Sequence, residues 1–247
     1  TSAFSESPKD LRNFFAAVAS CSPFLYSQIL KEKRWLLDII DDKNFNILSL
    51  LEHLKPEPFD TLYLKLRKAK KRAALWIALN DLAGFWSLEV VTKNLSAFAE
   101  KAINLSWHAS FLKELKKGKF PTHINSNPDK VGFFILAMGK LGAYELNYSS
   151  DIDLICFFDE DLYTPEEFPN VRRTFINATK NLYRVLNENG KDGYVFRTDL
   201  RLRPDPSVTP VCMGVDAAER YYASLGRTWE RAAFIKARVC AGDHSAG

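Results

Sequence analysis

The sequence predicts an α+β fold in which a helical N-terminal region, residues 1–120, precedes a module with a small mixed sheet flanked by helices, residues 121–247. Two patterns support this prediction. Through the first region, apolar side chains recur at spacings of three and four residues, which is typical of amphipathic helices. Beyond it, short continuous apolar runs appear, and such runs indicate strands that are buried on both faces.

The helical region is expected to begin at Pro8, because proline fits the first position of a helix and Ser7 is suited to cap it. Pro56 and Pro58 interrupt the apolar pattern, so a helix boundary is expected there. The other helices expected in this region span residues 23–30, 35–40, 61–84 and 85–115.

In the second region, strands are expected at Val131–Met138, Ile152–Phe158 and Tyr194–Leu202, the last with more alternation than the others. A helix is expected between the last two strands, over Asn170–Asn189, and the chain is expected to return to helix after Pro210. This order predicts a sheet with helices packed around it.

Composition argues against several classes of protein. No apolar run approaches the ~20 residues of a membrane-spanning helix, and the first residues lack the basic and then apolar order of a signal peptide. The formal net charge of +4 does not indicate a protein that works mainly by binding nucleic acid. The four cysteines and four histidines are scattered, so we expect no zinc site and reduced thiols in the cytoplasm.

Three carboxylates are the strongest candidates for chemistry. Asp151 and Asp153 are two residues apart on a predicted strand, so their side chains lie on one face. Asp199 lies on the next predicted strand. A solvated strand face would be the simpler interpretation, but the apolar neighbours indicate a buried strand, where unpaired carboxylates cost roughly several kcal/mol each. Mg²⁺ prefers hard oxygen ligands and bridges to phosphates, so these acids predict a Mg²⁺ site for in-line phosphoryl displacement.

Groups that bind phosphate are expected around these acids. Two glycines, Gly139 and Gly142, allow a tight turn that presents N–H groups and a short helix N-terminus to a phosphate, although Gly142 alone is equally consistent with an ordinary turn. Arginines on the face of Asp199 could neutralise phosphate charge. The candidate phosphate- and nucleotide-binding residues are Gly139, Lys140, Ser149, Ser150, Arg201 and Arg203.

Three stretches carry a resemblance to a known family. Residues 138–154 read Met-Gly-Lys-Leu-Gly-Ala-Tyr-Glu-Leu-Asn-Tyr-Ser-Ser-Asp-Ile-Asp-Leu and closely resemble a signature of the bacterial glutamine synthetase adenylyltransferase/adenylyl-removing enzymes. Residues 199–204 resemble a second signature, and residues 221–231 with 236–238 a third. Residues 70–81 and 89–95 are also similar, so the likeness covers most of the chain. Members of this family are several times longer, which implies that the chain is a fragment.

The resemblance implies that residues 121–247 form a nucleotidyltransferase domain of the DNA polymerase beta-like kind. Family members carry two such copies: the N-terminal copy removes AMP from a tyrosine of glutamine synthetase by phosphorolysis, releasing ADP, and the C-terminal copy adds AMP from ATP. Residues 145–153 and the helical lead-in are similar to the N-terminal copy. The implied activity is therefore deadenylylation, with Mg²⁺ as the cofactor and inorganic phosphate as a reactant. The implied protein partners are adenylylated glutamine synthetase and the signal protein PII.

Alternative interpretations stay open at the sequence level. The same chemistry can run forward as ATP-dependent adenylylation, and a non-catalytic module that senses PII is a more distant alternative. The basic run from Lys65 to Arg72 is interpreted as a solvated helix face, with a surface that meets glutamine synthetase or the adenylyl phosphate as the alternative. Residues 230–238 form an amphipathic stretch, and Lys236 or Arg238 facing the active site is equally open.

Overall fold

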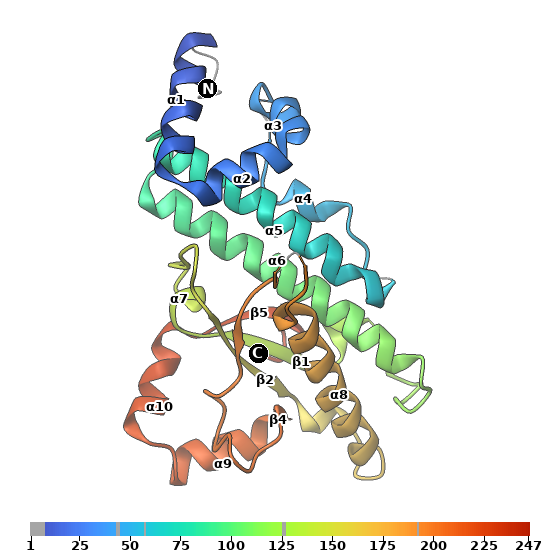
Figure 1. The fold of residues 1–247 in the computed structure, drawn as a ribbon. Coiled ribbons are helices and arrows are strands. Elements are labelled where there is room, and N and C mark those ends of the chain that lie inside the picture. The colour runs from blue at the N-terminus through green and yellow to red at the C-terminus, as the bar shows by residue number, and fades with distance from the viewer. Residues whose placement is uncertain (1–7, 43–44, 57, 125–126, 192) are drawn as a thin grey trace.

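The computed structural model describes residues 8–42, 45–56, 58–124, 127–191 and 193–247, so the expected N-cap Ser7 lies outside the described residues. Two long helices, α5 (Phe59–Leu82) and α6 (Leu88–Leu115), pack side by side between the N-terminal helices and the sheet (Figure 1). The N-terminal helices are α1 (Pro8–Cys21), α2 (Pro23–Lys31), α3 (Lys33–Ile40) and the single turn α4 (Ser49–Glu52). The helices expected from the apolar spacing are therefore confirmed, to within a few residues at their ends.

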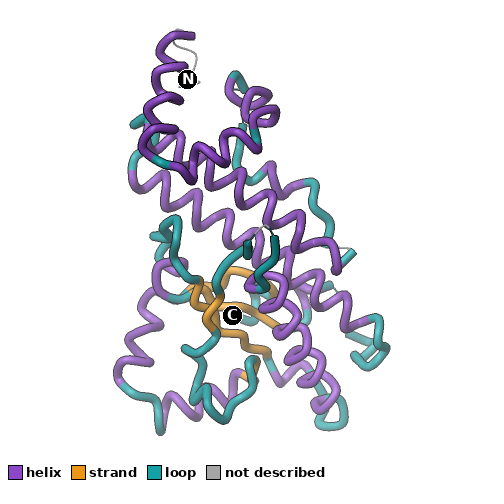
Figure 2. The backbone as a smooth tube through the Cα atoms, viewed as in Figure 1, coloured by secondary structure: helices purple, strands orange, loops and turns teal. Residues whose placement is uncertain are grey.

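The sheet is small and mixed, and helices flank it (Figure 2). Its order is β3-β2-β1-β5, and β4 also pairs with β2. The central strand β1 is antiparallel to β2 and β5, whereas β3 and β4 are parallel to β2. The strands are β1 (Phe133–Ala137), β2 (Ile152–Phe158), β3 (Thr198–Asp199), β4 (Cys212–Gly214) and β5 (Arg238–Gly242). This architecture confirms the predicted α+β fold class.

Both faces of β1 and β2 are buried, as their continuous apolar sequences predict. On one face Phe133 stacks on Trp107 of α6, with ring centroids 3.7 Å apart, and Phe175 of α8 (Phe168–Asn187) packs against both rings. On the other face Phe134 and Phe157 belong to a smaller apolar cluster. Helix α9 (Val215–Ser224) and the segment after α10 (Thr228–Ala233) supply the partners of that cluster.

The predicted strand Tyr194–Leu202 is wrong in its extent, because only Thr198 and Asp199 pair with β2. Before them, the N–H groups of Val195 and Phe196 both donate to the carbonyl of Leu186 at the end of α8. After them, the Asp199 carboxylate accepts the N–H of Arg201, and this side-chain turn ends the strand. A second short strand, β4, then pairs with Cys156–Phe158 of β2, so the return to helix after Pro210 is delayed until Val215.

The basic run between Lys65 and Arg72 is only partly a solvated face. Lys65 and Lys68 are exposed, but the Arg67 side chain is buried and Lys70 is partly buried. Arg72 donates to Glu32 at 2.6 Å and lies over the Trp35 ring. The interpretation of the whole run as solvated is therefore wrong, because α5 is covered by neighbours on more than its apolar side.

Helix α6, predicted as the last helix of the N-terminal region, packs on α8 and β5. One apolar core consequently joins the two predicted regions, and the boundary at residue 120 stays a prediction. No helix in the described part of the chain is long and apolar enough to span a membrane.

Candidate active site

The three predicted carboxylates meet at one edge of the sheet. Asp153 and Asp199 are register partners on the parallel strands β2 and β3, so their side chains lie on neighbouring positions of the sheet. Asp151 immediately precedes β2 and is two residues from Asp153. The sheet brings the acids together because β3 follows β2 in the same direction after the helix α8.

Asp153 is a carboxylate whose surroundings disfavour its ionised form. It is partly buried, and its side chain has no hydrogen bond or ion pair with any described residue. Burial raises the pKa of Asp153, and the negative charges of Asp199 and Asp151 raise it further. A bound cation at this position would relieve both effects.

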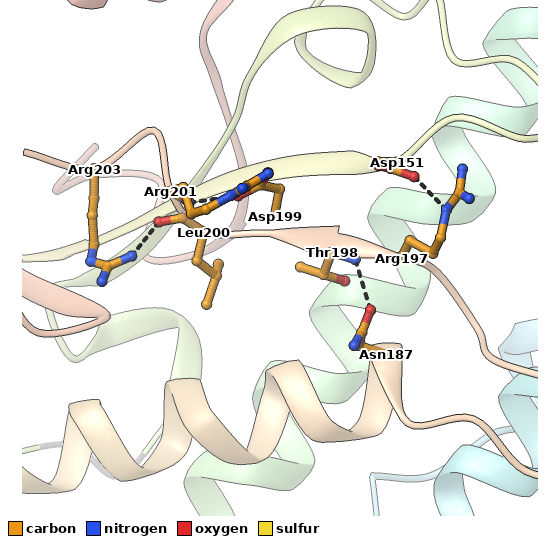
Figure 3. Close-up of polar contacts among 8 residues, drawn as sticks. All are labelled: Asp151, Asn187, Arg197, Thr198, Asp199, Leu200, Arg201 and Arg203. Carbon is orange, nitrogen blue, oxygen red and sulfur yellow. Dashed lines mark hydrogen bonds and ion pairs between the residues drawn. The ribbon is translucent and has the colours of Figure 1, made fainter. Parts of the chain in front are cut away.

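Two arginines neutralise the other two acids (Figure 3). The Nε of Arg197 lies 2.5 Å from Oδ1 of Asp151, and its Nη2 donates to the Ser149 carbonyl at 2.7 Å. Arg201 contacts both oxygens of Asp199, and the hydrogen bond from its side chain holds the pKa of Asp199 below its usual range. Sequence reasoning missed Arg197, because its pairing with Asp151 depends on the approach of two segments that are distant in the chain.

The three acids fit Mg²⁺ in the chemistry of their donors, which are all carboxylate oxygens. Asp153 also has no hydrogen-bond or ion-pair partner in the described part of the chain. Among the described residues, however, no three His, Cys, Asp or Glu side chains are grouped as a ready-made metal cluster. The ion pairs of Asp151 with Arg197 and of Asp199 with Arg201 occupy oxygens that a metal would need. The role of the acids as ligands stays a prediction.

The turn that begins at Gly139 lies against Asp153. Gly139 begins the one-turn helix α7 (Gly139–Gly142) and has a φ of +54°, a conformation that favours glycine. A Cβ built on Gly139 would lie 3.3 Å from Oδ2 of Asp153, so the backbone passes directly beside that carboxylate. The N–H of Met138 donates to the Asp153 carbonyl at 2.9 Å, which fixes the turn to β2.

The other candidate phosphate-binding residues differ in exposure and in whether their polar groups already have hydrogen-bond partners. Lys140 and Ser149 are exposed, whereas the Ser150 hydroxyl donates to Asn147 at 2.6 Å. Arg203 directs its guanidinium at carbonyls of its own loop, with the Leu200 oxygen at 2.6 Å and the Pro206 oxygen at 2.9 Å. In this arrangement Arg203 shapes the loop after β3, and contact with phosphate would require its side chain to move.

A cleft of about 430 Å³ opens over Asp151 and Asp199, within the usual size range of ligand pockets, and Asp153 lies outside its lining. Helix α8 contributes Lys180 and Tyr183 to it, two residues that sequence reasoning did not select. Their spacing of three along a helix places them on one face, which is the only sequence signal that could have found them. The cleft combines cations with acids, as binding of a phosphate bound to a metal requires. Its lining is Asp151, Lys180, Tyr183, Arg197, Thr198, Asp199, Leu200, Arg201 and Val211.

Arg238, at the start of β5, ties the glycine turn to the helical region. Its Nε and Nη2 donate to the carbonyls of Gly142 and Leu141 at 3.1 and 3.3 Å. Its Nη1 lies 2.8 Å from Glu100 of α6, and its guanidinium carbon lies 3.7 Å from the centre of the Tyr144 ring. Arg238 therefore supports the turn from behind and, among the described residues, has no hydrogen bond or ion pair with Asp151, Asp153 or Asp199. Lys236 pairs with Glu145 at 2.7 Å.

We expect Arg238→Ala to destabilise the chain by about 1.5–3 kcal/mol, because hydrogen bonds of a charged, mostly buried group are lost together. Arg238→Lys should recover only part of this loss, since an ammonium cannot reproduce the planar fork. Urea unfolding of both variants measures the difference. The control is Arg220→Ala, which removes the exposed ion pair between Arg220 and Asp216, whose charged atoms lie 3.9 Å apart. This variant should lower the free energy of unfolding by less than about 1 kcal/mol. Equal losses for Arg238→Ala and Arg220→Ala would contradict the supporting role.

Comparison with known proteins places these features in a family context. The profile of the family described as glutamate-ammonia ligase adenylyltransferase matches residues 13–247. A bifunctional glutamine synthetase adenylyltransferase/adenylyl-removing enzyme of Bradyrhizobium sp. (strain BTAi1 / ATCC BAA-1182) is 41% identical over 244 residues, which cover 96% of this chain and 25% of that enzyme. An enzyme of the same description from Caulobacter vibrioides (strain ATCC 19089 / CIP 103742 / CB 15) is 41% identical over 94% of this chain and 24% of its own length. The chain thus spans about a quarter of the length of these relatives.

Proposed function

Because the chain belongs to the glutamate-ammonia ligase adenylyltransferase family, whose members are nucleotidyltransferases, we propose that it removes AMP from an adenylylated tyrosine of glutamine synthetase by phosphorolysis. The observation that carries the proposal is the meeting of Asp151, Asp153 and Asp199 beside the turn at Gly139. The phosphorolytic direction rests on the likeness of residues 145–153 and of the helical lead-in to the adenylyl-removing copy.

The proposed reaction is a displacement at the phosphorus of the adenylyl group. An oxygen of inorganic phosphate forms a new bond to that phosphorus, and the bond from phosphorus to the tyrosine oxygen breaks. ADP leaves, and the tyrosine oxygen takes up a proton to restore the hydroxyl. Asp151, Asp153 and Asp199 would hold Mg²⁺, which when bound would offset negative charge on the transferring phosphoryl oxygens.

The chain's own groups have distinct tasks in this proposal. The backbone around Gly139 approaches the phosphates closely because no side chain intervenes. Ser149 supplies a hydroxyl donor near Asp151, and the exposed Lys140 supplies a cation. Ser150 would donate to phosphate only after its hydroxyl leaves Asn147. Arg201 lies in the cleft and carries free N–H capacity for phosphate beyond its contact with Asp199.

The test is an assay of both directions with this chain. We expect ADP to form from adenylylated glutamine synthetase only when phosphate and Mg²⁺ are both present, measured by chromatography of the released nucleotide. A parallel reaction contains unmodified glutamine synthetase and labelled ATP. Label transfer to the unmodified protein without ADP release in the first reaction would reverse the direction and assign adenylylation instead.

A non-catalytic module that senses PII is the second interpretation. It predicts no nucleotide release in either reaction, together with binding of PII by the isolated chain in a pull-down or calorimetric experiment. A catalytic role is favoured because a purely binding surface has no need for Asp153 and Asp199 as register partners with Asp151 just before β2.

A further inference from the structure

A second cleft, of about 570 Å³, lies between the helical region and the loop that leads to the carboxylates. Helices α2 and α5 form one wall, and the loops with Ser149 and Tyr194 form the other. It shares no lining residue with the cleft over the acids, yet Ser149 is only two residues from Asp151. A chain bound at the acids could therefore continue directly into this second cleft.

Lys70 of α5 is a cation in this cleft without an anionic partner among the described residues. Its Nζ lies 4.2 Å from the centre of the Phe196 ring and 5.2 Å from that of Tyr194, and it has no hydrogen bond or ion pair with the residues that the structure describes. Burial, and then the positive charge of Arg197, lower the pKa of Lys70 to about 8. An ammonium that is desolvated beside another cation would be stabilised by an anion placed next to it.

The same cleft exposes large apolar side chains. Phe24 is 64% exposed and Leu82 is 58% exposed, and both line it. The ligand that fits such a lining carries a negative charge and also apolar surface. Inorganic phosphate satisfies the charge but leaves these two side chains uncovered, whereas a peptide can present a carboxylate and an apolar side chain from neighbouring residues.

We propose that this cleft binds an acidic segment of the protein substrate that flanks the modified tyrosine, with a carboxylate against Lys70 and an apolar side chain against Phe24 and Leu82. This inference rests on the proposed function, since it assumes a protein substrate whose tyrosine lies at the carboxylates. It assigns a sequence preference around that tyrosine to the helical region rather than to the sheet.

Binding of short peptides tests the cleft without relying on catalysis. Two fluorescent peptides of equal length contain the same unmodified tyrosine and a leucine; one carries aspartates near the tyrosine, and the other carries asparagines in their place. We expect the acidic peptide to bind about tenfold more tightly in fluorescence anisotropy, as a charge-assisted hydrogen bond allows. Equal affinities for the two peptides would overturn the proposal.

Variants localise the preference. Lys70→Met keeps the aliphatic stem but removes the charge, and should abolish the preference for the acidic peptide. Lys68→Met removes an exposed charge from the same helix and should leave the preference intact. Leu82→Glu alters an exposed position at the end of α5, where folding is not at risk, and should weaken binding of the acidic peptide by repulsion. An undiminished preference in both Lys70→Met and Leu82→Glu would overturn the assignment.

An activity assay with the same peptides distinguishes a wrong assignment of the cleft from a wrong proposed function. The two peptides are adenylylated at the tyrosine, and ADP release is measured with phosphate and Mg²⁺. A binding preference without any ADP release supports the cleft and counts against the proposed phosphorolysis. Equal ADP release from both peptides, with equal binding, retains the phosphorolysis and overturns the cleft.

Discussion

Asp153→Asn is expected to lower phosphate-dependent ADP formation by at least about a thousandfold. The amide keeps the size of the side chain but removes the charge that a cation would bind. Loss of metal-assisted charge stabilisation is worth several kcal/mol, and each 1.36 kcal/mol is a factor of ten in rate. The measurement is the initial rate of ADP release from adenylylated glutamine synthetase at saturating phosphate and Mg²⁺.

The same substitution should not weaken the fold. An acid whose pKa is raised in the folded chain binds its proton more tightly there, so its ionised form opposes folding once the pH exceeds the ordinary value of 3.8. Burial and two neighbouring carboxylates raise the pKa of Asp153 in this way. At neutral pH the neutral amide should therefore give a Tm equal to or above that of the parent chain.

The matched control for Asp153→Asn is Asp161→Asn. Asp161 is exposed and follows Phe158, at the end of β2 opposite to Asp153. We expect full activity and an unchanged Tm. A fall in Tm for Asp153→Asn that parallels its loss of activity would indicate a structural role, and retention of more than a tenth of the activity would remove Asp153 from the chemistry.

The parts of the fold that depend on local pattern were predictable. Strand β2 was predicted with the bounds that the structure gives, because its apolar residues are interrupted only by Asp153 between Ser150-Asp151 and Asp159. Strand β5 was missed, since Arg238–Gly242 begins with a charge, contains two small residues and becomes a strand only by pairing with β1. The two halves of the sheet edge, β3 and β4, are too short to leave a periodic signal.

In the candidate site, too, the features set by local sequence were predictable and those set by long-range contacts were not. The spacing of Asp151 and Asp153 is a local signal, and it suffices to place both on one face of a strand. The ion pair of Arg197 with Asp151 and the support of the glycine turn by Arg238 join residues 46 and about 96 positions apart, for which one sequence carries no pattern. The partly buried state of Lys70 was likewise hidden, because a run of basic residues on a helix usually faces solvent.

Gly142→Ala is the substitution from which we expect the largest loss of stability. Gly142 ends α7, and a Cβ there would lie 1.8 Å from the Lys236 carbonyl oxygen and 2.6 Å from that of Ala137. Both obstacles are backbone atoms, so the new methyl group cannot be accommodated by a change of rotamer. We expect a loss of about 3 kcal/mol, at the upper end of the usual range for overpacking, and a fall in Tm of roughly 6–12 °C.

The control for Gly142→Ala separates crowding from backbone strain. Gly118 has a φ of +67° and nothing within 4 Å of the position of a Cβ, so Gly118→Ala introduces strain without a clash. That strain should lower the free energy of unfolding by about 1–2 kcal/mol, less than the loss for Gly142→Ala.

Because the segment that crowds Gly142 also carries Arg238, a shift at this contact would displace the turn at Gly139 from Asp153. Activity should therefore fall for Gly142→Ala even below its new Tm, whereas Gly118→Ala should keep the activity of the parent chain. Equal unfolding free energies for the two variants would mean that the turn and the segment before β5 are not held in this close contact.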